Sequence, residues 1–417
     1  MLEPFVSDRV GVWIVGALGG LGTTMVLGAR AVARELVSDT GLVTNRPEFA
    51  SLDLVDLDQL VFGGHEVRAS NYWESAYQVY KLSGSLDLEV IQELRSELDE
   101  ISKNLRPGTI VNSGDAIESL LTDKDAGEPE PLADTVARLR KDIREFREAH
   151  QLQRVVVVNL ASTEPDLTLG DDGLSELATP ADLTRIINAD GRDQVRPSML
   201  YSMAAFEEGC GYLNFTPSMA ALCPALASLG VERGLPFMGN DGKTGETLVK
   251  SALAPMFKYR NLQVLSWQGY NILGDRDGQV LSHGDNLASK VRSKDAVLQG
   301  ILGYPLHTHV GIDYVESLDD LKTAWDFIHF RGFLDHKMSM QFVWQGCDAI
   351  LAAPLVLDMV RFLDLALRDG QAGPLSHLAC YFKSPLGVGE HDLHQQFHSL
   401  MDFLAKRSET KAAASEP

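Results

Sequence analysis

An apolar run over residues 10–15 leads directly into a glycine-rich segment and then into a helical repeat. Residues 16–22 read Gly-Ala-Leu-Gly-Gly-Leu-Gly, and apolar side chains then recur at helical spacing from Met25 to Leu36. Strand, glycine loop and helix in this order are typical of dinucleotide-binding folds, because glycines permit a tight turn and let a pyrophosphate approach the helix N-terminus. The spacing G-x-x-G-G-x-G departs from the usual G-x-G-x-x-G. The segment predicts a nucleotide site within a parallel α/β fold.

In such folds an acidic residue at the end of the second strand holds the adenosine ribose. Asp53, Asp56, Asp58 and Glu66 all lie in the region that follows the first helix. Each can fill this role, and the sequence alone does not choose among them.

Further strands end in polar segments. The pattern predicts a strand over 109–112 with a loop at 113–115, and a β-branched strand over 155–158 that suits the centre of a parallel sheet. Polar residues follow at 159–165, and another polar strand end comes at 214–217. Ligands of open α/β sheets bind beyond the carboxyl ends of the strands, so we expect these segments beside a ligand.

A second concentration of polar residues lies between residues 239 and 294. A loop with three glycines at 239–247 leads into a helical pattern, and a strand over 262–267 leads into another polar loop. Lys290 and Lys294 follow, four residues apart, which puts both ammonium groups on one face of a helix. Turns and solvated lysines are the common explanations of each feature alone. Their concentration in one segment favours a binding site.

After this segment, periodicity predicts a helix over 318–327 and a long apolar helix over 348–367. A strand over 378–382 and a closing helix over 393–404 complete the chain. The alternation of strands and helices indicates the α/β class.

The composition limits the partners of the chain. The formal net charge of −21 argues against a nucleic-acid or membrane partner, because either needs a basic surface. Against this negative field, clustered lysines indicate an anionic substrate. The sequence contains no apolar run of about 18 residues and no charged leader, and its four cysteines are scattered, so we expect a cytoplasmic protein with reduced thiols.

Two groups of histidines could suggest a metal site. His307 and His309 fit one face of a strand, and His391, His394 and His398 fit one face of a helix. Neither group has carboxylates at a clear metal-binding spacing, which favours structural or surface roles.

The segments 239–247, 270–278 and 289–294 together resemble the inositol-phosphate synthase family in its shorter, archaeal-type form. Lys322, Asp348 and Lys383 match the family's motifs in the same order. With the N-terminal glycine loop, the similarity spans nearly the whole chain.

The resemblance implies an architecture. A Rossmann-type, doubly wound NAD-binding domain would be formed by residues 1–244 and 349–417. A smaller α+β domain, residues 245–348, would be inserted between them and would carry catalytic residues and the contacts of a homotetramer.

The resemblance also implies a reaction, the isomerisation of D-glucose 6-phosphate to 1L-myo-inositol 1-phosphate for inositol and phospholipid biosynthesis. NAD oxidises the C5 hydroxyl, the C6 proton is lost, the enolate attacks the C1 aldehyde, and the hydride is returned. Lys383 would take the C5 hydroxyl proton, and Lys290 would stabilise charge at the C1 and C5 oxygens. Lys294 and Lys322 would hold the phosphate and the enolate.

Other residues carried over by the resemblance orient these groups or hold the cofactor. The orienting residues would be Asp241, Asp277, Asp348, Asn271 and Leu273. The cofactor-binding residues would be Gly16, Ala17, Leu18, Gly19, Gly20, Leu21, Gly22, Glu66, Ser113, Thr163 and Asp241. The archaeal-type form also allows for a divalent metal ion bound by oxygen ligands near the phosphate.

Two alternatives stand beside this interpretation. A related NAD-dependent carbocyclase could close a different ring on another sugar phosphate, and only product analysis separates the two. A non-catalytic NAD-binding homologue is the other alternative. The lysine set Lys290, Lys294, Lys322 and Lys383 argues against it, because a protein without activity has no physical reason to keep clustered like charges.

Overall fold

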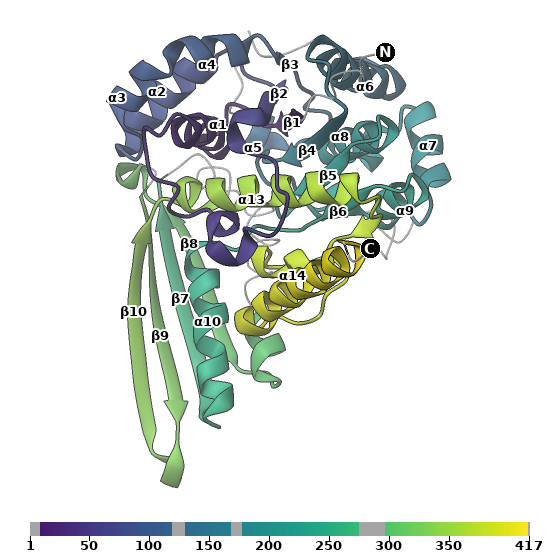
Figure 1. Cartoon of the computed structure of the whole chain (residues 1–417). Coiled ribbons are helices and arrows are strands. Elements are labelled where there is room, and N and C mark those ends of the chain that lie inside the picture. Colours follow the sequence, from purple (N-terminus) through teal and green to yellow (C-terminus); the bar gives the residue numbers. More distant parts are fainter. Residues whose placement is uncertain (1–8, 119–129, 168–176, 275–296, 320, 416–417) are drawn as a thin grey trace.

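The structure, a computed structural model, describes residues 9–118, 130–167, 177–274, 297–319 and 321–415. It contains a seven-stranded sheet and a four-stranded sheet. Figure 1 shows the larger sheet surrounded by helices and the smaller sheet extending away from it.

The seven-stranded sheet has the order β11-β6-β5-β4-β1-β2-β3, and all its strand pairs are parallel. Its strands are β1 (Val10–Val15), β2 (Leu60–Glu66), β3 (Leu105–Pro107), β4 (Arg154–Asn159), β5 (Gly211–Asn214), β6 (Pro236–Met238) and β11 (Gly373–Pro374). The chain builds outward from β1 in one direction and outward from β4 in the other. The predicted Rossmann-type α/β class is confirmed, and the order reverses between β1 and β4, where such sheets bind ligands.

Helices cover both faces of this sheet. The helices of this part of the chain are α1 (Gly20–Ala33), α2 (Tyr72–Ser83), α3 (Leu88–Glu93), α4 (Arg95–Ser102), α5 (Asp115–Glu118), α6 (Leu132–Ala149), α7 (Pro180–Asn188), α8 (Pro197–Glu207), α9 (Pro224–Glu232), α13 (Asp348–Arg368) and α14 (Leu393–Ser415). Val12 and Ile14 belong to the hydrophobic cluster on one face of the sheet, and Trp13 and Val15 to the cluster on the other. This alternation follows from the two-residue period of a strand buried on both sides.

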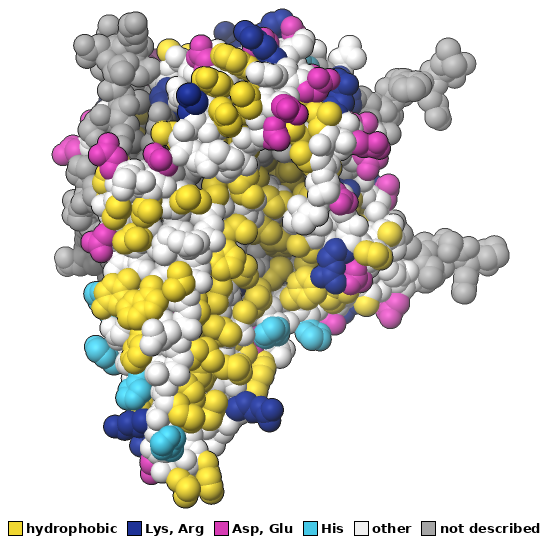
Figure 2. Space-filling view, turned by 90° about the vertical axis from the view of Figure 1, so that its left-hand side faces the viewer, with side chains coloured by type: hydrophobic (Ala, Val, Ile, Leu, Met, Phe, Trp, Pro, Cys, Tyr) yellow, Lys and Arg dark blue, Asp and Glu magenta, His cyan; other side chains and the backbone are white. Residues whose placement is uncertain are grey.

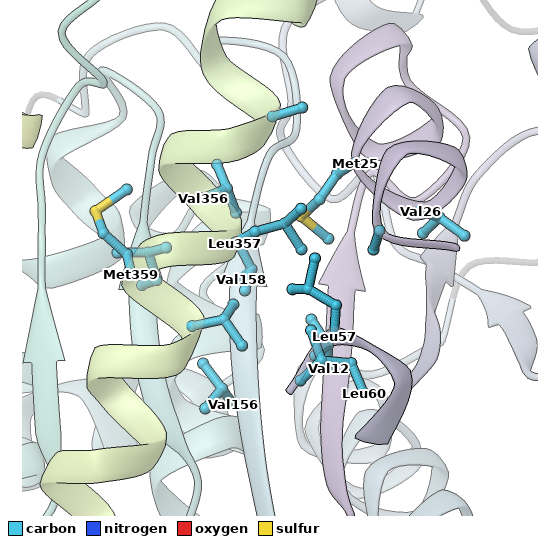
Figure 3. Packing of buried hydrophobic residues seen from close by; sticks show 14 of the residues in the cluster. Val12, Met25, Val26, Leu57, Leu60, Val156, Val158, Val356, Leu357 and Met359 are labelled. Carbon is cyan, nitrogen blue, oxygen red and sulfur yellow. The ribbon is translucent and has the colours of Figure 1, made fainter. Parts of the chain in front are cut away.

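The C-terminal part of the chain completes the core of the N-terminal part. Helix α13 packs beside α1 on the same face of the sheet. Val12, Met25 and Leu357 point into the space between β1, α1 and α13 (Figure 3). The larger unit therefore depends on residues from both ends of the sequence.

The four-stranded sheet has the order β10-β9-β7-β8 and is mixed, because β7 pairs with β8 in parallel and with β9 antiparallel. Its strands are β7 (Gln263–Leu273), β8 (His307–Tyr314), β9 (Lys322–Arg331) and β10 (Lys337–Gly346). Helix α10 (Gly245–Tyr259) covers one face, where Phe257, Trp267 and Phe330 form a separate hydrophobic cluster.

Three predicted elements are wrong. Residues 109–112 are not a strand, because pairing with β2 stops at Pro107 and the Thr109 N–H donates to Tyr201 Oη at 2.7 Å. Residues 318–327 are not a helix, since β9 begins at Lys322. The predicted strand at 378–382 is mostly a 3₁₀ helix, Ser376–Tyr381. Among the described helices, none is long and apolar enough to cross a membrane.

Candidate active site

The glycine loop after β1 lies at the point where the strand order reverses. Gly16 has a φ of +80°, and a Cβ there would lie 2.9 Å from Ala161 Cα in the loop after β4. A Cβ on Gly22 would lie 2.6 Å from the carbonyl oxygen of Ala17. A Cβ on Gly20, by contrast, would meet no atom within 4 Å. Two glycines therefore allow close backbone packing, and the third leaves the N-terminus of α1 open to an anion.

Of the four acidic candidates for the ribose, Glu66 is the one at the end of β2. Its Oε2 accepts a hydrogen bond from the Leu18 N–H at 2.7 Å, and its Oε1 accepts one from the Val67 N–H at 2.9 Å. Asp53 instead pairs with Arg368. The carboxylate of Glu66 therefore lies against the glycine loop and is held there by backbone donors.

The loops after β3 and β4 lie side by side. The Arg196 guanidinium donates to the carbonyl oxygens of Asn112 at 2.5 Å and Pro165 at 3.1 Å, which ties the two loops together. Ser113 and Thr163, the cofactor residues predicted in these loops, are both buried. Ser113 Oγ has no hydrogen-bond partner among the described residues. Open glycine backbone, a strand-end carboxylate and an unpartnered buried hydroxyl are groups that fit a bound dinucleotide.

A chain of buried amides crosses the carboxyl ends of β4, β5 and β6. Asn159 Nδ2 donates to Asn214 Oδ1 at 3.1 Å, and Asn214 Nδ2 donates to Asn240 Oδ1 at 2.6 Å. The predicted polar strand ends at 159–165 and 214–217 are therefore joined to the loop after β6. Asn240 is not among the predicted site residues, and its position in the 239–247 motif is the one signal that the sequence offers for it.

The loop at 239–243 is held by backbone bonds on both sides. The Asp241 N–H donates to the Thr216 carbonyl at 2.9 Å, and the Lys243 N–H donates to the Tyr381 carbonyl at 2.8 Å. The Lys383 N–H in turn donates to the Asp241 carbonyl at 2.7 Å. The segments around Thr216 and Lys383, far apart in the sequence, therefore fix this loop at the carboxyl end of β6.

Two lysine–aspartate pairs flank this loop. Lys383 Nζ lies 2.8 Å from Asp241 Oδ1, and both side chains are buried. Lys322 Nζ lies 2.9 Å from Asp348 Oδ2. The second pair lies at the N-terminus of α10, because a Cβ on Gly245 would be 3.1 Å from Asp348 Oδ1 and 3.9 Å from Lys322 Nζ. One pair therefore lies at Asp241 and the other at Gly245, four residues further along the chain.

The remaining predicted residues divide into two groups. Asn271 and Leu273 are buried on the face of β7 that α10 covers, and Asn271 Nδ2 donates to Glu246 Oε2 at 2.8 Å. Lys290, Lys294 and Asp277 lie outside the described residues.

Several buried ionisable groups were missed. Lys243 is 1% exposed and its Nζ donates to Gln396 Oε1 of α14, while burial lowers its pKa to about 8. Glu246 and Lys250 form a buried ion pair beside Asn271. Their spacing of four residues in the predicted helix was a usable signal for this pair.

A metal site has no support in the described parts of the chain, where no three His, Cys, Asp or Glu side chains are grouped to hold an ion. His307 and His309 are exposed on β8, and His309 lies 5.2 Å from the Tyr270 ring.

A doubly wound parallel sheet with a glycine loop at its reversal point defines a Rossmann-type protein, and two lysine–aspartate pairs lie at the loop beyond its β6 strand. The chain belongs to the NAD-binding family of myo-inositol-1-phosphate synthases. The family's sequence profile, described as myo-inositol-1-phosphate synthase, matches residues 10–405.

Individual relatives agree with this assignment. Inositol-3-phosphate synthase 1 of Bacteroides thetaiotaomicron is 34% identical over an alignment 420 positions long, which covers 94% of this chain and 92% of the relative. The inositol-3-phosphate synthase of Dictyostelium discoideum is 26% identical, with coverages of 86% and 75%. The crystal structure of inositol-3-phosphate synthase from Caenorhabditis elegans matches with a TM-score of 0.84 at 23% identity, covering 95% of this chain and 85% of that one. This last likeness shows a shared fold.

Proposed function

We propose that the protein converts D-glucose 6-phosphate to 1L-myo-inositol 1-phosphate by an NAD-dependent isomerisation without net oxidation. The observation that carries the proposal is the meeting of two lysine–aspartate pairs at the loop beyond β6. The relatives are named inositol-3-phosphate synthases, which supports an inositol phosphate as the product.

The residues proposed to hold the cofactor are the glycine loop at 16–22, Glu66, Ser113, Thr163 and Asp241. Bound NAD supplies a reversible acceptor for the hydride of the C5 carbon. The open N-terminus of α1 would bind the pyrophosphate, because its free N–H groups point outward and the helix dipole favours negative charge. Glu66 would both shape the loop and accept ribose hydroxyls.

Lys383 is proposed to receive the proton of the C5 hydroxyl as the hydride departs. Its Nζ is fixed by Asp241 Oδ1 at 2.8 Å and lies at a segment bonded to the edge of the nucleotide sheet. The same group would return the proton when the C5 ketone is reduced. Asp241 would orient Nζ in both states, as the neutral amine before the proton transfer and as the ammonium after it.

Lys322 is proposed to bind negative charge beside the N-terminus of α10. Asp348 holds the ammonium, and the first N–H groups of the helix add positive potential to the same place. The phosphate and the enolate formed by loss of the C6 proton both need such a site. Lys290 and Lys294 would complete the cation set, with Lys290 at the C1 oxygen that becomes a hydroxyl when the ring closes.

The test is incubation of the protein with glucose 6-phosphate and NAD⁺, followed by NMR of the product and absorbance of NADH. We expect an inositol phosphate and no net NADH while the substrate disappears. Stoichiometric NADH would indicate a dehydrogenase, and a different carbocycle would indicate a related cyclase. Tight NAD binding without turnover would indicate a non-catalytic homologue.

We also infer a homotetramer that forms through the outer face of the four-stranded sheet. On this face the Tyr270 and Trp325 rings stack at 5.7 Å, and Val343 is 63% exposed. Figure 2 shows hydrophobic side chains gathered along the narrow end of the molecule, with histidines beside them. Contiguous exposed apolar surface of this kind is typical of protein interfaces. A monomer in light scattering at micromolar concentration would contradict the inference.

Domain boundaries at 244/245 and 348/349 are proposed as well. The separate sheet and separate hydrophobic cluster within residues 245–348 support an inserted unit. A cytoplasmic location is proposed on the four free cysteines, which suit a reducing compartment.

A further inference from the structure

A buried ionic cluster joins the first turns of α10 to the four-stranded sheet. Glu246, Lys250 and Asp326 are each no more than 1% exposed. Lys250 Nζ lies 2.6 Å from Glu246 Oε1 and 3.6 Å from Asp326 Oδ1. The strand leaves room for this cluster at Gly269, where a Cβ would lie only 2.2 Å from Glu246 Oε1.

Packing alone does not account for the cluster. Apolar residues of similar volume would hold a helix on a sheet without the desolvation cost of buried charges. The cluster also contains two carboxyl groups for one ammonium group. Asp326 receives a second donor, Trp267 Nε1, at 2.6 Å. These contacts leave the second oxygen of each carboxyl group, Glu246 Oε2 and Asp326 Oδ2, and of the two it is Glu246 Oε2 that bonds to a predicted site residue.

Glu246 Oε2 accepts a hydrogen bond from Asn271 Nδ2 at 2.8 Å. The same nitrogen lies 3.4 Å from the Gly311 carbonyl oxygen. Both neighbours are acceptors, so only the NH₂ end of the amide can face them. The orientation of the amide is therefore fixed by chemistry, and Oδ1 must point the other way.

This orientation turns Asn271 Oδ1 away from Glu246 and Gly311. The side chain is fully buried, and Oδ1 has no hydrogen-bond partner among the described residues. A buried acceptor without a donor is unfavourable unless a ligand or water supplies one. Glu246 directly follows Gly245, where Lys322 and Asp348 meet the helix, so the amide lies next to the proposed substrate site.

We propose that Glu246 is a positioning residue that holds the Asn271 amide with its oxygen turned to the substrate, where it accepts a hydrogen bond from a sugar hydroxyl. Lys250 occupies Oε1 of Glu246 and thereby leaves Oε2 for the amide. The identity of the ligand, a polyhydroxylated phosphate ester, rests on the proposed function. The orientation of the amide does not depend on the proposed function.

The test compares Glu246→Leu, which removes the acceptor, with Glu246→Gln, which can still present an oxygen to Asn271. We expect Glu246→Leu to raise the KM for glucose 6-phosphate by up to about tenfold, the loss of one hydrogen bond, with the NAD Kd unchanged. Glu246→Gln should recover most of the affinity. If Glu246→Leu does not fold, Glu246→Asp replaces it, because its shorter side chain keeps the charge but withdraws from Asn271.

Trp267→Phe is the matched control, since it disturbs the same buried cluster through Asp326 and leaves the contacts of Asn271 intact. It should lower the melting temperature without changing the KM. An equal KM change in Trp267→Phe and Glu246→Leu would overturn the proposal, because the effect would then be one of general stability.

Crystal structures of the wild type and the variant separate this proposal from the proposed function. The Asn271 side chain should rotate in the variant that lacks the acceptor, whatever the natural substrate is. An unchanged rotamer would refute the positioning role. Absence of glucose 6-phosphate turnover by the wild type would instead refute the proposed function.

Discussion

Replacing Lys383 by methionine should stop the first oxidation without displacing the loop that it contacts. The variant loses the amino group whose Nζ lies 2.8 Å from Asp241 Oδ1 but keeps a stem of similar length. The backbone of the segment is held independently, because the N–H groups of Lys383 and Ser384 donate to Asp241 and Asn240 at 2.7 Å and 3.2 Å. Binding of NAD should therefore be unchanged.

The magnitude has a kinetic and a thermodynamic part. Loss of a positioned proton acceptor typically slows a step by about 10²–10⁴-fold. The buried Asp241 carboxylate loses its lysine partner, so the free energy of unfolding should fall by about 1–3 kcal/mol. The loss of rate is the larger of the two effects, and it should be observed while the variant is still folded.

The assay is a single turnover with glucose 6-phosphate and bound NAD⁺, followed by the absorbance of NADH. Lys243→Met is the control, because it removes another buried lysine, from the loop that Lys383 contacts, and that lysine is bonded to α14. The control should keep its NADH transient, and Lys290→Ala should keep oxidation while it impairs the later carbon chemistry. A transient at the wild-type rate in Lys383→Met would refute the assigned role, even if the enzyme assignment stood.

Three further outcomes are expected. Gly22→Ala should weaken NAD binding and lower the Tm, because its Cβ would lie 2.6 Å from the Ala17 carbonyl oxygen; an unchanged Kd in calorimetry would contradict the role of this close packing. Burial lowers the Lys243 pKa from 10.5 to about 8, so between these pH values the folded state has lost this proton while the unfolded state still holds it. The free energy of unfolding therefore rises with pH across this range. Lys243→Met should remove that rise, about 3 kcal/mol by linkage, in denaturation curves across this pH range. Val343→Glu, on an outward position of β10 that is 63% exposed, should reduce the assembly state measured by sedimentation, and an unchanged state would exclude this face as the interface.

The sequence predicted best where local pattern and tertiary burial agree. Residues 10–15 form β1 as expected, because a short apolar run followed by glycines has few other places than the centre of a parallel sheet. The β-branched run at 155–158 lies within β4 for the same reason. Both strands are buried on two faces, so neighbouring elements reinforce the local preference.

The prediction failed where contacts from distant segments decide the structure. In β9, Ala324, Asp326 and Ile328 are buried, while the alternate positions carry Trp325 and Phe327. Apolar residues on both faces hide the two-residue period, and the run cannot be told from a helix by pattern. At 376–381 the chain bonds to the 239–243 loop instead of a strand, which no local signal records.

The pairing inside the site is also a long-range property. Asp241 and Lys383 are separated by 142 residues, and motif order gives their identities without showing that they touch. The pairing follows from the path of the chain: residues 239–244 leave the nucleotide sheet through α10, and α13 returns to it from Asp348. Both crossings between the two sheets carry site residues. A ligand that binds Lys383 and Lys322 together would therefore couple the position of the four-stranded sheet to the nucleotide loop.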